Sequence, residues 1–317
     1  MARIVSIGSA LQDIFLVDHD DFGTNTKGFF NQLELGAKVD IDKIKYSTGG
    51  GATNAATTFA RNGHESIFIG CISHDSAGQA ILNSLDDEGI DSSYVTFLDR
   101  EQTGSSIVML PPSGERTILT CRGASSRFDA LEPNDLDDIH PNWLYVTTFR
   151  GDMDMLDHFF MKARSLKTKI MFNPGNLELK HPRKLIGLLS DVEVLLVNKK
   201  EAQQIVEGHL LTELVSKLAS YVPKVIITDG SQGGIATDGE EVYRFGIYED
   251  VKVKDATGAG DAFGSGFLAA YTNGKSFKDS LIFASANSTS VIQRIGSKDG
   301  IISANAQTHT MPIQEIR

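Results

Sequence analysis

The chain has 317 residues and a formal net charge of −11, with 41% hydrophobic and 22% charged residues. This composition is typical of a globular protein with a sizeable core, and the excess of acids argues against a nucleic-acid or anionic-membrane surface. Its two cysteines, Cys71 and Cys121, lack the neighbours of a disulfide scaffold or structural zinc. Without a signal peptide or an apolar run of roughly 20 residues, we expect a cytoplasmic protein with a small-molecule partner.

Short apolar runs alternate with helix-like segments along most of the chain. Strands are predicted at residues 3–8, 66–73, 142–149, 168–174, 192–198 and 224–230. Helices are predicted at residues 51–63, 77–89, 201–207 and 211–220. This alternation predicts an α/β fold, with a mostly parallel sheet that helices cover on both faces.

Two segments break the alternation. Residues 29–47 alternate polar and apolar side chains, and residues 103–121 form two β-rich runs about a PPSG turn, which is a hairpin signal. We expect lid strands inserted around 14–47 and 100–121, paired into a small second sheet that serves as a lid or a dimer contact. Extra edge strands on the main sheet are the alternative.

A glycine-rich stretch, DATGAGDAFGSGF, carries one carboxylate in its middle, Asp261. The sequence around it reads as a strand from 251, a glycine turn and an apolar helix. Backbone N–H groups at such a helix start suit a phosphate, although the GxxxxGK[ST] pattern of a P-loop is absent. Asp261 is then either a carboxylate that suits the helix dipole or a base for an attacking hydroxyl.

Three further clusters carry polar residues beside glycines or strand ends. STGGGATNAA places Asn54 at a helix start, and with Asp13 it suits sugar hydroxyls or serves only as capping. In NKKEA, Asn198 and Glu201 hold magnesium through water or form a capping box. The fourth cluster, TDGSQGG, is a nucleotide loop or a plain turn.

These four motifs together resemble the ribokinase-like (PfkB) carbohydrate kinase family. DATGAGDAFGSGF resembles the signature D-T-x-G-A-G-D, with Ala256 where Thr is frequent, and GGGATNAA resembles the N-terminal signature. NKKEA and TDGSQGG are similar to the motifs N-x-x-E and T-x-G-x-x-G. The motifs occur in the family's order, so the resemblance covers essentially the whole chain.

The resemblance implies a three-layer α/β/α sandwich with a small β lid, as one kinase domain over residues 1–317. It implies transfer of the ATP γ-phosphate to a primary alcohol, with Mg2+ accompanying ATP. A sugar is the expected acceptor and a nucleoside the alternative. A homodimer through the lid is also implied. Phe29, Phe30 and Tyr46 either stack a base or belong to the core or an interface.

The resemblance also implies a role for each motif residue. Asp261 is the general base, and the backbone of Gly258, Ala259 and Gly260 forms the anion hole. The sugar contacts are Asp13, Gly49, Gly50 and Asn54, together with Asp261. Asn198 and Glu201 support magnesium and the phosphates, and the nucleotide contacts are Asn198, Thr228, Gly230, Gly233, Gly258, Gly260 and Asn287. A monovalent cation such as K+ lies beside Asp255 and Thr257, although the segment RIGSKDG departs from the family's usual sequence there.

Arg122 is the best basic candidate near the substrate, with a surface arginine as the alternative.

Two other classes of function are alternatives for this sequence. A dinucleotide-dependent oxidoreductase needs GxGxxG after an early strand, but the first strand here ends in GSALQD. A sugar sensor without catalysis is the other alternative, and the presence of Asp261 counts against it.

Overall fold

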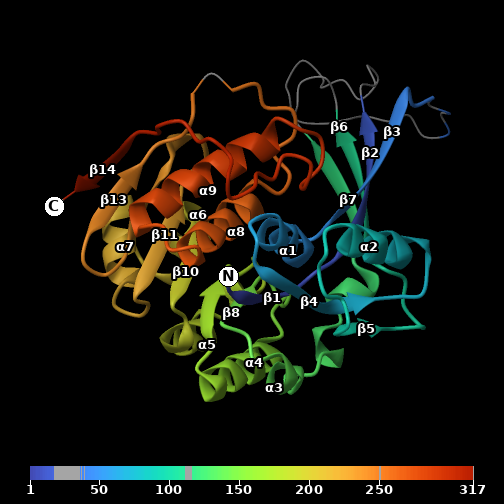
Figure 1. Cartoon of the computed structure of the whole chain (residues 1–317), viewed down its shortest axis with the longest axis horizontal. Helices are drawn as coiled ribbons and strands as arrows, with labels where there is room; N and C mark the ends of the chain where they lie inside the picture. The colour runs from blue at the N-terminus through green and yellow to red at the C-terminus, as the bar shows by residue number, and fades with distance from the viewer. Residues whose placement is uncertain (18–35, 37, 39, 111–115, 250, 317) are drawn as a thin grey trace.

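The computed structural model describes residues 1–17, 36, 38, 40–110, 116–249 and 251–316 (Figure 1). Its main sheet has the strand order β14-β13-β12-β11-β10-β9-β8-β1-β4-β5. The strands are β1 Arg3–Ile7, β4 Glu65–Ile72, β5 Val95–Phe97, β8 Trp143–Val146, β9 Lys169–Phe172, β10 Val194–Asn198, β11 Lys224–Thr228, β12 Gly234–Thr237, β13 Val242–Phe245 and β14 Ile313–Ile316. From β5 to β11 the neighbours are parallel, and from β11 to β14 they are antiparallel.

Helices cover both faces of this sheet, as Figure 1 shows. They are α1 Gly51–Arg61, α2 Ser76–Asp87, α3 Asp135–Ile139, α4 Met153–Leu166, α5 Pro182–Leu188, α6 Lys199–Ile205, α7 Leu211–Leu218, α8 Ala259–Thr272 and α9 Phe277–Ile292. On β10, Leu195 packs with the cluster that contains α4 to α7, while Leu196 packs with the cluster of α8 and α9. Alternate side chains of one strand thus enter opposite cores, and the predicted three layers are confirmed.

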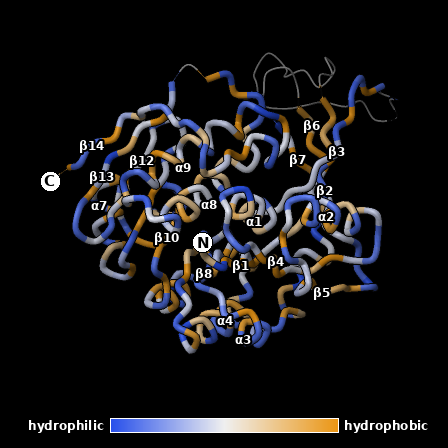
Figure 2. Tube along the Cα trace, in the orientation of Figure 1, coloured by the Kyte–Doolittle hydropathy of each residue, from blue (hydrophilic) through white to orange (hydrophobic). Residues whose placement is uncertain are grey.

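Hydrophobic residues gather along the central strands, and hydrophilic residues gather on the outer turns (Figure 2). No helix in the described ranges is long and apolar enough to cross a membrane.

A second, four-stranded sheet stands beside the first and is called the lid here (Figure 1). Its order is β3-β2-β6-β7, with β2 Leu11–Val17, β3 Lys43–Gly49, β6 Ser105–Leu110 and β7 Thr117–Cys121. The expected second sheet is therefore confirmed, and the alternative of edge strands on the main sheet is wrong. Phe29, Phe30 and the PPSG turn lie outside the described residues.

The strand predicted from residue 251 is wrong. Residues 251–255 form a loop whose Lys254 and Asp255 N–H groups both donate to the carbonyl of Ile292, at 2.8 and 3.2 Å. The alternation VKVK imitates a strand, but this segment pairs with the end of α9 rather than with a sheet edge.

Candidate active site

The glycine-rich loop is a rigid entrance to helix α8. Gly258 caps the helix with φ +77°, and Asp261 lies in the first turn. A carboxylate oxygen of Asp255 accepts from the N–H and hydroxyl of Thr257 at 2.9 and 2.6 Å, and its other oxygen accepts from the Gly296 N–H at 3.1 Å. This buried carboxylate therefore fixes the conformation of the loop.

The start of α8 leaves two N–H groups available for an anion. The N–H of Ala259 donates to Ala256 at 3.4 Å, and helical bonding resumes with Ala262 donating to Gly258 at 2.8 Å. Between them, the N–H groups of Gly260 and Asp261 have no acceptor within the described chain. Two adjacent free donors at a helix N-terminus are suited to phosphate oxygens.

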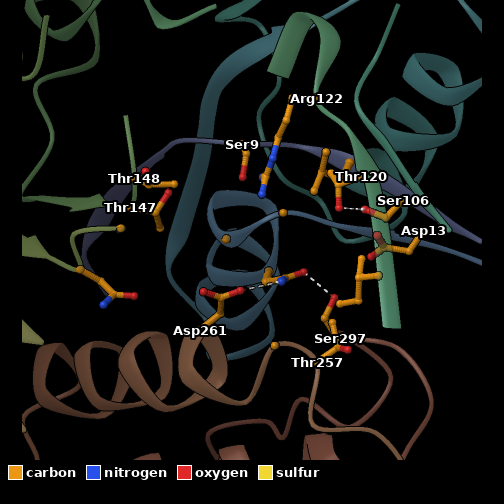
Figure 3. Close-up of a pocket in the computed structure, with 18 of the residues that line it drawn as sticks. Ser9, Asp13, Ser106, Thr120, Arg122, Thr147, Thr148, Thr257, Asp261 and Ser297 are labelled. Carbon is orange, nitrogen blue, oxygen red and sulfur yellow. Dashed lines mark hydrogen bonds between the residues drawn. The ribbon is translucent and has the colours of Figure 1, made fainter. Parts of the chain in front are cut away.

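Asp261 is held by a chain of hydrogen bonds from two other segments. The Asn54 amide of α1 donates to Asp261 Oδ2 at 2.9 Å, and the Ser297 hydroxyl donates to Asn54 Oδ1 at 2.8 Å (Figure 3). Burial raises the pKa of Asp261, and the Asn54 hydrogen bond opposes that shift. Asn54, predicted as a sugar contact, therefore also positions the carboxylate.

The glycine run before α1 makes room for two carboxylates. A Cβ at Gly49 would stand 2.2 Å from Asp13 Oδ2, and a Cβ at Gly51 would stand 3.3 Å from Asp261 Oδ1. Gly50 has φ +100°, and its Cβ would stand 2.3 Å from a backbone carbonyl. A side chain at Gly49 would displace Asp13, one at Gly50 would clash with the backbone, and one at Gly51 would crowd Asp261, which is the physical reason for three consecutive glycines.

Asp13 lies on the pocket-facing side of the lid. On β2 it pairs with Ser106 of β6 and Ser47 of β3. Its side chain is 5% exposed, and burial raises its pKa from 3.8 to about 6, against the opposing effects of a Ser106 hydrogen bond and the charge of Lys298. This carboxylate is a strong acceptor for a ligand hydroxyl.

Asp13→Asn is expected to stabilise the protein at pH 8 and to change its stability little at pH 4. The folded-state pKa lies above the unfolded value, so keeping Asp13 charged above about pH 6 costs the folded state free energy. The gain has an upper limit of about 3 kcal/mol, since each pKa unit is worth about 1.4 kcal/mol. Thermal denaturation of both proteins at the two pH values measures it, and equal differences at both would contradict the account.

The carboxyl ends of β10 and β11 carry the residues predicted to hold magnesium and nucleotide. Asn198 and Thr228 are register partners there. Asn198 caps α6, accepting from the Glu201 N–H at 3.0 Å, while Glu201 Oε2 accepts from the Asn198 N–H at 2.8 Å. The capping-box interpretation is thus confirmed. Glu201 also lines the pocket, and burial raises its pKa.

A magnesium ion fits this site only with help from a ligand. The described residues hold no group of three or more His, Cys, Asp or Glu side chains placed to bind a metal. Glu201 retains one carboxylate oxygen outside the capping box. This donor set fits an ion carried on ATP phosphates, with water between it and Glu201.

The backbone conformation of the TDGSQGG loop requires its glycines. Gly230 and Gly233 have φ +56° and +76°, and a Cβ at Gly233 would stand 2.1 Å from the Phe245 carbonyl. These residues follow β11 beside the pocket but do not line it.

Asn287, for which the resemblance implies a nucleotide contact, lies buried between α9 and α8. Its side chain is 0% exposed, with Nδ2 donating to the Ala262 carbonyl at 2.8 Å and Oδ1 accepting from the Ile302 N–H at 2.9 Å. The amide ties α9 to α8 and to the segment after it. Its hydrogen bonds explain its presence without a ligand.

The pocket between the main sheet and the lid has a volume of about 350 Å³. It contains Asp13, Gly50, Asn54, Glu201, Thr257, Gly258 and Asp261 of the predicted set. The residues that sequence reasoning missed include Ser9, Ser106, Thr120, Thr147, Thr148, Asn173 and Ser297. Thr147 and Asn173 follow strand ends, where ligands gather in open α/β sheets. For Ser297, which reaches the pocket from a distant loop, the sequence carries no signal.

Known proteins resemble this chain over most of its length. The pattern of the pfkB family carbohydrate kinases matches residues 1–304. A ribokinase of Haemophilus influenzae is 25% identical over 261 residues, spanning 80% of this chain and 83% of the relative. A nucleoside kinase of Methanocaldococcus jannaschii is 22% identical over 298 residues, spanning 93% of this chain and 95% of the relative.

Solved structures share the fold. Ribokinase from Arabidopsis thaliana, complexed with ribose and ATP, gives a TM-score of 0.78 at 22% identity over 96% of both chains. An E. coli structure in complex with ATP and Mg2+ gives 0.77 at 19% identity, over 96% of this chain and 97% of that one.

The layered sheet, its lid and the pocket between them place this protein among the sugar and nucleoside kinases. More specifically, the chain belongs to the pfkB family of carbohydrate kinases. The resemblance inferred from its four motifs is confirmed.

Proposed function

We propose that the protein transfers the γ-phosphoryl group of ATP to a primary hydroxyl of a sugar, as one kinase domain over residues 1–317. The observation that carries the proposal is the position of Asp261, which lines the pocket together with Gly258 at the start of α8, where two N–H groups have no acceptor within the described chain. A base and an anion hole side by side are what phosphoryl transfer requires of a protein.

In the proposed reaction, the Asp261 carboxylate accepts the proton of the acceptor hydroxyl. The hydroxyl oxygen forms a bond to the γ-phosphorus while the bond to the bridging oxygen of ADP breaks, and that electron pair leaves with ADP. The N–H groups of Gly260 and Asp261 stabilise charge on the phosphoryl oxygens. Asn54 and Ser297 keep the carboxylate aimed into the pocket. Bound Mg2+ neutralises phosphate charge.

Glu201→Gln is expected to raise the KM for MgATP by about 10- to 100-fold, the usual effect of losing a group that acts on a metal through water. Glutamine can still accept the Asn198 N–H bond, so the start of α6 is preserved. Initial rates at varied MgATP measure the effect. Glu213→Gln is the matched control, since Glu213 caps α7 at the same helical position. Equal KM changes in both variants would contradict a role at the phosphates.

We propose a sugar rather than a nucleoside as the acceptor, and the polar side chains facing the pocket from the lid support this. Asp13, Ser106 and Thr120 form a row across three lid strands. A coupled ADP-release screen over pentoses, hexoses, ketoses and nucleosides tests it. Turnover of nucleosides alone would replace the sugar assignment. NAD-dependent oxidation without ATP turnover would overturn the kinase assignment for this chain.

We propose a homodimer through the outer face of the lid. Tyr46, Ile107 and Leu119 lie in one row across the sheet and are 65%, 41% and 56% exposed. Exposed apolar rows of this kind mark protein contacts. We expect Leu119→Glu to halve the mass seen by light scattering, and a monomeric mass in the unmodified protein would contradict the dimer.

We further propose that the protein works in the cytoplasm, where ATP is available. Cell fractionation tests this proposal.

We also propose that K+ binds beside the glycine loop, near Asp255 and Thr257. Arg116 already approaches Asp255 to 3.9 Å, so the ion would share this carboxylate with a lid cation. Rates that are equal in potassium and choline salts would contradict a K+ site.

A further inference from the structure

The pocket contains one charged group for which the proposed sugar has no use. Arg122 is the one basic side chain that lines the pocket among the described residues. It follows β7 and lies on the same strand face as Thr120, so its side chain enters from the lid (Figure 3). The sequence alternative of an ordinary surface arginine is therefore wrong.

The backbone of Arg122 is fixed while its guanidinium is free. Its carbonyl accepts from the Ser125 hydroxyl at 2.6 Å and from the Ser125 N–H at 3.1 Å. The guanidinium has neither a hydrogen bond nor an ion pair within the described residues. The acids that line the pocket, Asp13, Glu201 and Asp261, make no hydrogen bond or ion pair with this guanidinium in the described structure.

An unpaired guanidinium that loses water when a ligand binds costs free energy, unless the ligand supplies a hydrogen-bond acceptor. The side chain is half-buried, and burial, together with the neighbouring charge of Arg150, lowers its pKa. A second positive charge nearby increases the advantage of binding an anion. A neutral sugar would leave five N–H donors without a charged partner, whereas a phosphate or carboxylate matches the guanidinium in charge and geometry.

We propose that the phosphoryl acceptor is itself an anion, a sugar that carries a phosphate or carboxylate group paired with Arg122. This inference rests on the proposed kinase function and names its substrate class. The position of Arg122 favours the acceptor over ATP as its partner, because Arg122 enters from the lid beside Thr120, whereas Thr257 and Asp261 belong to the glycine loop and the start of α8 on the other side of the close-up (Figure 3).

Matched acceptors that differ in charge test the proposal. ADP release is measured with ribose against ribose 1-phosphate, fructose against fructose 6-phosphate, and glycerol against glycerate. We expect the anionic member of at least one pair to have a kcat/KM about 10- to 150-fold higher, the range for a charge-assisted hydrogen bond. The phosphate and carboxylate pairs separate the two kinds of anion. Preference for the neutral member in every pair would overturn the proposal.

Arg122→Gln is expected to abolish the preference by raising KM for the anionic acceptor, with the neutral acceptor changed less than about 3-fold. Arg122→Lys should retain part of it, because the charge remains without the bidentate fork. Arg100→Gln, at an exposed arginine, is the control, and melting temperatures report folding. If Arg122→Gln lowers kcat equally for both acceptors, the guanidinium serves the transferred phosphoryl group and the proposal is wrong. If the proposed kinase function itself is wrong, none of the compounds will increase the release of ADP.

Discussion

Asp261→Asn is expected to lower kcat by about 10²- to 10⁴-fold, the contribution of a positioned general base. Asparagine can still accept the hydrogen bond from Asn54, so the hydrogen-bond chain to Ser297 is preserved while the basic oxygen is lost. We expect the melting temperature not to fall, because the substitution removes a buried charge that costs the folded state free energy, as its raised pKa indicates. Steady-state kinetics, with ATP affinity from calorimetry, separate turnover from binding.

A matched variant distinguishes catalysis from helix capping. Asp279 is in the first turn of α9, three residues after its cap, as Asp261 is in α8. Asp279→Asn removes the same favourable interaction with a helix dipole, on the surface and outside the pocket. We expect it to leave kcat unchanged. Near-normal turnover in Asp261→Asn would show that Asp261 is only a dipole-capping residue.

Gly258→Ala is expected to lower kcat by about 10²- to 10³-fold, comparable to losing one donor from an anion hole. Alanine is strained at φ +77°, and its Cβ would stand 2.5 Å from the Cβ of Ser297. The loop must shift, which misplaces the free N–H groups and moves the serine that holds Asn54.

The control for this variant is Gly187→Ala, at a helical glycine whose Cβ would meet no atom within 4 Å. We expect that change to leave kinetics and ATP binding intact. If Gly258→Ala retains normal turnover, the loop conformation is not part of the anion hole.

Much of the fold was predictable because buried parallel strands are continuous apolar runs, as in β8 and β10. The lid was predictable from the alternation in residues 29–47 and the hairpin signal in residues 103–121, which overlap β3, β6 and β7. Residues 251–255 show the limit of this reasoning. Alternation indicates a strand only where a partner strand exists, and partnership is decided by the tertiary fold. The short antiparallel strand β14 was missed because its partner β13 lies about 70 residues earlier in the chain.

The parts of the site that could be predicted are those where the backbone conformation or a close approach requires glycine. Gly50 and Gly258 have positive φ, and Gly49 gives space to Asp13, so these motifs point to real geometry. For Asn287 the sequence does not separate two roles, because a buried amide that joins two segments has the same sequence appearance as one that meets a ligand. Ser297 depends on how a distant loop returns to the pocket, which local sequence does not encode.

The most direct test of the central claim is to identify the product. The protein is incubated with MgATP and a pool of sugars, sugar phosphates, sugar acids and nucleosides, and phosphorus NMR follows the γ-phosphate. We expect ADP and a new phosphate monoester to form in equal amounts, and we expect Asp261→Asn to abolish nearly all formation of both. Acceptor-independent ATP hydrolysis, or a product whose formation survives that substitution, would contradict it.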